Sequence, residues 1–490
     1  MAKPTPNLSQ ALSRAISAYN AGKLVDAERL CQQIINTKRD LFDALHLLAV
    51  VQWRLGKNDM ALASYDRALK VRPDYAEALC NRGVTLHELK RFEEALASYD
   101  RALKARPDYA EALYNRGNTL KELRRLEEAL ASYDRALKAR PDYAEALCNR
   151  GITLHKLKRF EEALASYDRA LKVRPNLAEA HFNEAACRLL IGDFDRGWEK
   201  NEWRWATEQQ RNKKWNFAQP QWTGQEDIAG RTILLHSEQG LGDTIQFCRY
   251  VPLVAARAGR VILGVPRTLR ELMSTLPGVA QIASKGDPLP DFDVHCPLLS
   301  LPLAFGTRLE TIPSATPYLR ASAPAVTEWN ARLGPGTRPR IGLAWSGHPM
   351  HENDHNRSIG LSTLLPLLGL DATYVSLQQD VRAGDATVLQ GRSDLLHFGD
   401  QLKTFSDTAA LISNLDLVIS VDTSIAHLAG ALAKPVWVLL PFLPDWRWLL
   451  DREDSPWYPT ARLFRQDDTR QWDNVIARVQ AALHEFVRGL

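Results

Sequence analysis

Small and apolar residues in the first 200 positions recur every 34 residues, with the spacing of amphipathic helices inside each unit. The unit Ala76–Tyr109 is followed by two further copies, each of which differs from it at five positions. A proline closes each copy, at Pro107, Pro141 and Pro175, where a helix cannot continue. Less regular copies extend the pattern to both sides. Because a single helix pair cannot bury its apolar face, we predict a stacked α-helical solenoid of five to six repeats over residues 1–211.

From Arg231 the pattern changes to short apolar runs that alternate with amphipathic stretches. This alternation predicts mainly parallel sheets covered by helices on both faces. We expect two Rossmann-like α/β lobes, residues 228–325 and 326–490, with ligands beyond the carboxyl ends of their strands. A tryptophan-rich junction at residues 212–227 would join them to the solenoid. The clustered tryptophans suit either carbohydrate stacking or a domain interface, and the large area that tryptophan buries favours the interface.

Charge and composition narrow the possible partners. The 490 residues carry 62 basic and 58 acidic side chains, a net charge of +4, which gives no case for nucleic acid or an anionic membrane as the main partner. No apolar run is long enough for a membrane span, and the start of the chain has no secretory pattern. The six cysteines form neither CxxC nor a zinc spacing, so we expect buried thiols in a reducing cytoplasm.

The first candidate site follows the buried run Leu417–Ser420, in DLVISVDTSIAHLAGALAKP. The predicted strand delivers Asp422, Thr423 and Ser424 to the start of a helix, and His427 lies one turn further on. Free backbone N–H groups and the helix dipole favour a phosphate at such a position.

The second candidate is SEQGLGDTIQF, after the first predicted strand of the α/β region. Gly240 and Gly242 allow a tight turn, and Asp243 stands at the start of the next helix. An aspartate there serves either as a helix cap or as a base that takes a proton from an attacking group.

The third candidate is WSGHPMHENDHNRSIGL. Ser346 and Gly347 can approach a phosphate, and Arg357 can compensate its charge. Gln378, after a later strand, is placed for a contact to a base or ribose. The histidines of this loop raise the alternative of a metal site, but their spacing matches no firm ligand rule, and we expect no metal.

Together the three segments resemble the heptosyltransferase-like glycosyltransferases of GT-B fold, over the region from Arg231 to the end. The resemblance implies a nucleotide sugar as co-substrate without a further cofactor. It implies that the loop from Asp422 to His427 holds the diphosphate, and that Asp243 is the base of a metal-independent inverting transfer. The first lobe is shorter than in that family, and no glutamate is assigned to the ribose, so the base and the sugar stay open.

The repeats resemble tetratricopeptide repeats (TPR). One position of the first helix carries an asparagine ladder, Asn81, Asn115, Asn149 and Asn183. An amide both donates and accepts, so such a column can hold the backbone of an extended peptide. The ladder is similar to that of O-GlcNAc transferases, although asparagine is also common there in repeats that bind nothing at this position.

We therefore predict a bacterial, cytoplasmic glycosyltransferase, hexosyl- or heptosyltransferase-like, that modifies a Ser or Thr side chain of a protein held by the solenoid. Two alternatives stay open. The chain could be a non-catalytic TPR scaffold that senses a nucleotide sugar, or a transferase acting on a glycan or lipopolysaccharide.

Overall fold

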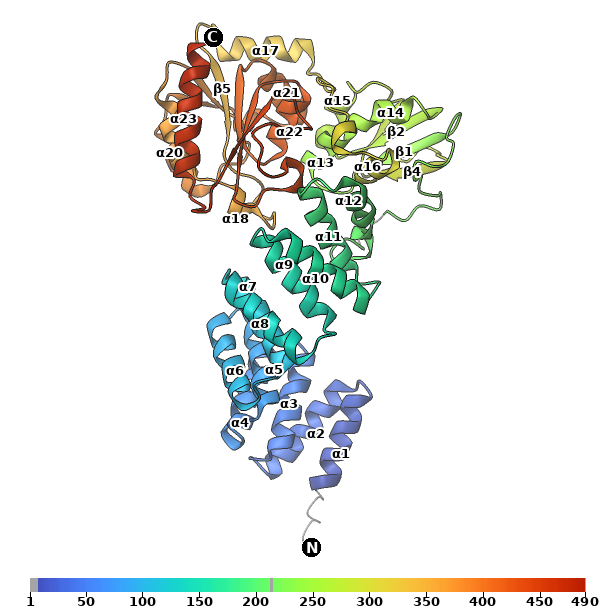
Figure 1. The fold of residues 1–490 in the computed structure, drawn as a ribbon, viewed down its shortest axis with the longest axis vertical. Coiled ribbons are helices and arrows are strands. Elements are labelled where there is room, and N and C mark those ends of the chain that lie inside the picture. The colour runs from blue at the N-terminus through green and yellow to red at the C-terminus, as the bar shows by residue number, and fades with distance from the viewer. Residues whose placement is uncertain (1–7, 212–214, 490) are drawn as a thin grey trace. The chain divides into compact units, whose positions relative to one another are not determined.

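The computed structural model describes residues 8–211 and 215–489. The chain divides into two compact units, Met1–Glu184 and Ala185–Leu490 (Figure 1). The predicted junction begins at residues 212–214, which lie outside this description, and the predicted domain limits at 211, 227 and 325 stay predictions.

The first unit is an α-helical solenoid of consecutive helical hairpins, as the repeats predict. Its helices are α1 (Leu8–Asn20), α2 (Leu24–Thr37), α3 (Phe42–Arg54), α4 (Asn58–Val71), α5 (Ala76–Glu88), α6 (Phe92–Ala105), α7 (Ala110–Glu122), α8 (Leu126–Ala139), α9 (Ala144–Lys156) and α10 (Phe160–Val173). Helix α11 (Ala178–Leu190) begins in the first unit and ends in the second.

The two helices of each repeated hairpin pack closely through a glycine on the first helix and a tyrosine on the second. A Cβ on Gly117 of α7 would lie 2.6 Å from Cε1 of Tyr133 in α8, closer than side chains approach. Tyr133 is fully buried and donates a hydrogen bond to Asn118 Oδ1 at 2.7 Å. The recurring glycine is therefore a packing requirement of the hairpin.

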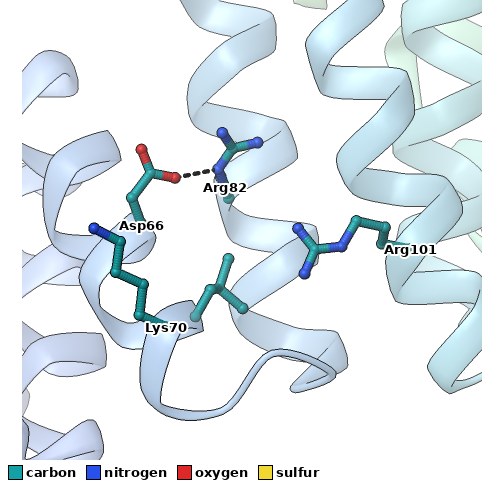
Figure 2. A pocket seen from close by; sticks show the side chains of 5 residues that line it. Asp66, Lys70, Arg82 and Arg101 are labelled. Atoms are coloured by element: carbon teal, nitrogen blue, oxygen red, sulfur yellow. Dashed lines mark hydrogen bonds and ion pairs between the residues drawn. The ribbon is translucent and has the colours of Figure 1, made fainter.

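Arginines link neighbouring repeats through the same polar contacts each time. Arg82 of α5 donates to Asp66 of α4 at 2.7 Å and to Ser98 of α6. Figure 2 shows this ion pair at the edge of a hollow of about 300 Å³, whose wall also includes Lys70 and Arg101. Arg116 and Arg150 make the equivalent pairs, so these contacts fix the stacking of the repeats.

The second unit contains two parallel sheets. The four-stranded sheet has the order β3-β2-β1-β4 and the six-stranded sheet has the order β10-β9-β8-β5-β6-β7. The strands are β1 (Thr232–His236), β2 (Arg260–Gly264), β3 (Gln281–Ala283), β4 (Val294–Pro297), β5 (Arg340–Ala344), β6 (Thr373–Ser376), β7 (Leu395–His397), β8 (Leu417–Val421), β9 (Val436–Leu440) and β10 (Ala461–Arg465). If the strands of the larger sheet are numbered from β5 as the first, their order is 3-2-1-4-5-6, which is that of a doubly wound α/β fold. The smaller sheet has the order 3-2-1-4, the first four strands of the same arrangement.

The α-helices of the second unit follow the strands in alternation. They are α12 (Phe194–Asn201), α13 (Leu241–Phe247), α14 (Val251–Ala255), α15 (Arg270–Met273), α16 (Leu301–Ala304), α17 (Ala323–Leu333), α18 (Asp354–Arg357), α19 (Leu361–Leu364), α20 (Ala383–Gln390), α21 (Phe405–Ser413), α22 (Ser424–Ala431) and α23 (Asp473–Arg488). Short 3-10 turns complete the connections, among them η1 (Glu202–Ala206), η7 (Leu365–Gly369) and η9 (Trp446–Trp448). Within the described residues, no helix combines the length and apolarity that crossing a membrane requires.

Helices cover both faces of the larger sheet, while the smaller sheet is covered unequally. The apolar residues of α21 and α22 pack on one face of the six-stranded sheet, and those of α19, η7 and α23 pack on the other. In the four-stranded sheet, Leu234, Ile262 and Ala283 form a small apolar cluster with Phe217 and Phe292, which lie outside any helix. The chain around Pro220 to Trp222 also pairs with β4. An extended segment therefore takes the place of helices on this face.

Candidate functional site

In each sheet the strand order changes direction at one point. The residues of the second unit that the sequence predicts as functional lie near these two points. In the larger sheet the reversal lies between β5 and β8, and in the smaller sheet between β1 and β4. The loops after β5 and β8 carry Ser346 and Asp422, and Asp243 lies in the first turn of α13, the helix that follows β1. In open parallel sheets this position, beyond the carboxyl ends of the strands, is where ligands bind.

The loop after β8 ends in an N-capped helix. The Thr423 hydroxyl caps α22 by accepting from the backbone N–H of Ile425 at 3.4 Å, and it also contacts Ser420 Oγ at 3.2 Å. Asp422 is almost completely buried, and burial together with the Asp445 carboxylate raises its pKa to about 6. Ser424 is the first residue of α22, so the start of this helix offers N–H groups and a positive dipole end.

His427 is a neutral, fixed side chain within α22. Its Nδ1 lies 2.9 Å from the Tyr458 hydroxyl, and its ring stacks on Trp448 with centroids 5.4 Å apart. Burial, followed by the positive charges of Arg447, Arg249 and Arg357, lowers the pKa of His427 far below its usual value. A neutral imidazole provides one donor and one acceptor, but no charge for a phosphate.

The start of α13 lies directly against the start of α22 (Figure 1). The two helices approach at Gly242, where a Cβ would be 2.8 Å from His427 Cδ2 and 3.5 Å from Ser424 Cα. Gly240 precedes α13, and its N–H donates to Asp243 Oδ2 at 2.7 Å. Asp243 is thus the third residue of α13 and bonds the N–H of the N-cap residue Gly240, so the expected N-cap role itself belongs to Gly240.

Arg357 joins the loop after β5 to the loop after β8. Its Nη1 donates to the Asp422 carbonyl at 2.8 Å, and a Cβ on Gly347 would lie 2.7 Å from its Nη2. Ser346 is buried, and its hydroxyl has no hydrogen-bond partner among the described residues. Arg382, which the sequence analysis missed, donates to the Gly347 carbonyl at 3.1 Å. The three predicted residues therefore lie together, as the motif suggests.

Gln378 has a structural role that its sequence position did not indicate. Its amide accepts from the Ser346 N–H at 3.2 Å and donates to the Ser346 carbonyl at 3.0 Å. It also donates to the Asp380 carbonyl at 3.1 Å, and the side chain is buried. These bonds hold the loop after β5, so the amide meets a ligand only if it gives up part of this pairing.

Arg447 is the main residue of the site that the sequence analysis missed. Its guanidinium forms an ion pair with Asp243, although the two residues are 204 positions apart in the chain. No motif marks Arg447, so only the folded chain reveals the contact. Within the described residues, no group of three or more His, Cys, Asp or Glu side chains has a geometry that could hold a metal ion.

A second buried polar cluster lies beyond β1 and was also missed. Glu238, whose side chain is 1% exposed, forms an ion pair with the fully buried Arg204 at 3.1 Å. Arg204 also bonds Glu202 at 2.6 Å and Ser300 at 2.8 Å. Burial raises the pKa of Glu238 to about 7, despite the opposing charge of Arg204. A carboxylate five positions before Asp243 was the signal that could have drawn attention to this cluster.

The asparagine ladder is half-buried in the first unit and partly engaged with neighbouring repeats. Asn149 donates to Tyr114 Oη at 3.1 Å and to Asn118 Oδ1 at 2.8 Å, and Asn115 approaches Cys80 Sγ at 3.8 Å. Asn183 bonds the Glu179 carbonyl of its own helix at 2.7 Å. Asn81 lies at the equivalent position of α5, so the structure places the four amides at one position of successive first helices.

Family profiles match both parts of the chain. The tetratricopeptide repeat profile matches residues 46–110, 114–178 and 148–197. The glycosyltransferase family 9 (heptosyltransferase) profile matches residues 403–439, the segment that contains β8, α22 and β9. The second match includes Asp422, Thr423, Ser424 and His427.

One curated relative extends the similarity beyond these segments. Protein FlbA of Caulobacter vibrioides is 27% identical over 331 residues, which cover 62% of this chain and 55% of FlbA, so the chain spans about half of that relative. Among solved structures, PilF of Pseudomonas aeruginosa matches with a TM-score of 0.37 and 19% identity, covering 39% of this chain and 88% of PilF. A tetratricopeptide repeat protein of Parabacteroides merdae matches with a TM-score of 0.36 and 23% identity, covering 40% of this chain and 77% of that protein. These two similarities are too low to say anything of function. The chain thus combines tetratricopeptide repeats with an α/β region that resembles the heptosyltransferases of glycosyltransferase family 9.

Proposed function

We propose that this protein transfers a sugar from a nucleotide-sugar donor to a Ser or Thr side chain of a polypeptide held by the solenoid. In this proposal the second unit is a GT-B-type pair of lobes. The family 9 match supports the class of reaction, and the TPR match supports a polypeptide as the acceptor.

The observation that carries the proposal is the contact between the starts of α13 and α22. Gly242 touches His427 and Ser424, so the helix that bears Asp243 begins beside the capped helix start after β8. An inverting transfer needs a base on the acceptor side and charge compensation on the donor side. We assign the first task to Asp243 and the second to the start of α22.

The proposed step is a direct displacement. The acceptor hydroxyl oxygen forms a bond to the anomeric carbon while the bond from that carbon to the diphosphate oxygen breaks. Asp243 accepts the hydroxyl proton, because a carboxylate that already receives bonds from Arg447 and Gly240 still has free lone pairs. The electron pair leaves with the nucleoside diphosphate.

The N–H groups at the start of α22 and the guanidinium of Arg357 are assigned to the departing diphosphate. Arg357 already lies within bonding distance of the Asp422 carbonyl, next to this helix start. A helix start and a fixed fork of donors compensate negative charge without a metal ion. Ser346 and Gly347 line the same loop and are assigned to the donor as well.

The solenoid is assigned to the acceptor. The amides of Asn81, Asn115, Asn149 and Asn183 stand at one position of successive repeats, and an amide can both donate to and accept from a polypeptide backbone. The donor base, the donor sugar and the acceptor sequence are open in this proposal.

A panel of UDP-, GDP-, ADP- and CMP-sugars, read by mass spectrometry, tests the proposal. We expect slow hydrolysis of one donor by the wild type and its loss in Asp243→Asn, with circular dichroism to check that the variant keeps its fold. Full activity of this variant would show that Asp243 is not the base. Thermal stabilisation by a nucleotide sugar without any turnover would instead favour the sensor.

Deletion of residues 1–177 separates the acceptor classes. The second unit is compact from Ala185 onward, so the deletion removes repeats without cutting into that unit. We expect donor hydrolysis to remain and transfer to protein to disappear. Transfer to a glycan that survives the deletion would favour the lipopolysaccharide-type alternative.

A further inference from the structure

Arg447 connects the two lobes of the second unit at the position of the proposed base. It lies in η9, in the connection between β9 and β10, and is 7% exposed. Its Nε donates to Gln246 Oε1 at 2.7 Å, its Nη1 donates to Asp445 Oδ1 at 2.7 Å, and its Nη2 donates to Asp243 Oδ1. Two of these three acceptors, Gln246 and Asp243, belong to α13, so one guanidinium bonds that helix at two successive turns.

The surroundings keep this guanidinium charged and fixed. It lies over the Trp446 ring at 4.2 Å and near the Phe247 ring at 5.7 Å. Burial opposes its charge, but the carboxylates of Asp445 and Asp243 outweigh burial and raise the pKa of Arg447. A planar fork with each nitrogen bonded has little freedom to turn, which makes it a rigid support for a carboxylate.

Other charged groups also act on this part of the site. The Gly240 N–H bonds the second oxygen of Asp243. Arg447 interacts electrostatically with Asp422 and Asp445, and it also acts on His427. His351 interacts with Asp243 and Asp445, while Arg357 and Arg249, which lies in η3 (Cys248–Tyr250), act on His427. Among them, Arg447 is the one that bonds Asp243 directly.

We propose that Arg447 is a positioning residue for the transfer, which holds the Asp243 carboxylate in register with the helix start after β8. This inference rests on the proposed function. Arg447 acts through Asp243 and Gln246 of α13, while Gly242 sets the distance of the same helix from α22. The base and the diphosphate-binding loop are thereby fixed relative to each other by one buried cation and one close backbone approach.

Loss of Arg447 should disturb the transfer more than the binding of the donor. Glutamine in its place cannot keep the bonds to Asp243, Asp445 and Gln246 together, so the Asp243 carboxylate loses its fixed position. A misplacement of about 1 Å can reduce a rate by about 100-fold, so we expect kcat of Arg447→Gln to fall by about that factor while the KM for the donor stays near that of the wild type. Arg447→Lys keeps one charged donor but loses the planar guanidinium, so its kcat should fall less.

Asp445→Asn provides a second test that does not depend on the folding of Arg447→Gln. The Asp445 side chain is 36% exposed, so the change is mild for the fold. The asparagine amide oxygen can still accept from Arg447 Nη1, but this bond lacks the opposite charge that strengthens it in the wild type. We expect kcat to fall less than in Arg447→Gln, again with an unchanged KM for the donor.

Arg249→Lys is the matched structural control. Arg249 is another buried arginine that crosses between the lobes, but its nitrogens bond the Gln246 and Trp457 carbonyls and the Tyr318 hydroxyl rather than a carboxylate. We expect this variant to melt at a lower temperature while kcat and the KM for the donor stay near those of the wild type.

The experiment measures kcat and KM separately for the donor of the panel that the wild type hydrolyses fastest. A fall of kcat at unchanged KM in Arg447→Gln, with smaller falls in Arg447→Lys and Asp445→Asn, supports the positioning role. An unchanged kcat in Arg447→Gln, or an equal fall in Arg249→Lys, overturns it while leaving the transfer itself intact. A wild type that hydrolyses no donor refutes the transfer and, with it, the positioning role.

Discussion

Replacing Gly242 by alanine tests the contact on which the proposed site depends. The new methyl group would lie 2.8 Å from His427 Cδ2. His427 cannot easily move away, because Tyr458 bonds its Nδ1 and Trp448 stacks on its ring. Overpacking a rigid contact of this kind costs about 1–3 kcal/mol.

Gly384→Ala provides a matched control for the helix itself. Gly242 and Gly384 are each the second residue of a helix, α13 and α20, and a Cβ on Gly384 would touch nothing within 4 Å. Alanine is better than glycine in a helix by up to about 1 kcal/mol, so the control should be neutral or stabilising. The difference between the two variants then isolates the contact with His427, and we expect Gly242→Ala to be less stable by about 1–3 kcal/mol.

Chemical denaturation and donor turnover measure the two consequences. Relief of the clash would push the start of α13 away from α22, and a misplacement of about 1 Å can reduce a rate by about 100-fold. Equal stability of the Gly242→Ala and Gly384→Ala variants, with kcat unchanged in both, would refute the close contact. In a double-mutant cycle, His427→Ala should cost less in the Gly242→Ala background than in the wild type.

Three further predictions concern stability. Folding raises the pKa of Glu238 from 4.5 to about 7, so the folded state binds this proton more tightly than the unfolded state. The free energy of unfolding of the wild type, relative to that of Glu238→Gln, should therefore fall by about 3 kcal/mol between pH 4.5 and 7. Denaturation of both proteins across this pH range measures the difference, and parallel curves would contradict the prediction. Arg124 has a left-handed φ of 59°, at a turn where an earlier repeat has Gly56. Because glycine adopts this conformation without strain, Arg124→Gly should raise the free energy of unfolding by about 0.5–1 kcal/mol. A lower melting temperature of the variant would contradict this prediction. Gln378→Glu should cost about 1–3 kcal/mol because it loses the bond to the Ser346 carbonyl; a change confined to the KM for the donor would indicate a ligand contact instead.

Much of the architecture could be predicted from local sequence. The solenoid follows from the 34-residue repeat, and the runs at Leu417–Ser420 and from residue 231 to 236 correspond to β8 and β1. The short edge strands β3 and β10 were missed. An edge strand of few residues has little hydrophobic pattern of its own, because much of its stability comes from pairing with its neighbour.

The candidate site, too, could be predicted from the sequence only in part. Asp422, Thr423 and Ser424 stand in one continuous segment, so a strand followed by a helix start was enough to suggest a phosphate-binding loop. For Asp243 the sequence left two roles open, and the structure adds a cap contact with Gly240 and an ion pair with Arg447. Its role as the base stays a prediction that activity measurements must decide.

By itself, the sequence determined the repeat period, the alternation of strands and helices, and the motifs that stand in continuous segments, because each depends on residues a few positions apart. Only the tertiary structure decided which distant side chains meet. Arg447 reaches Asp243 across 204 positions, and Gly242 fits against His427 because two helices from different lobes pack together. Such partners are set by the packing of whole elements, which leaves no trace in the pattern around any one of them.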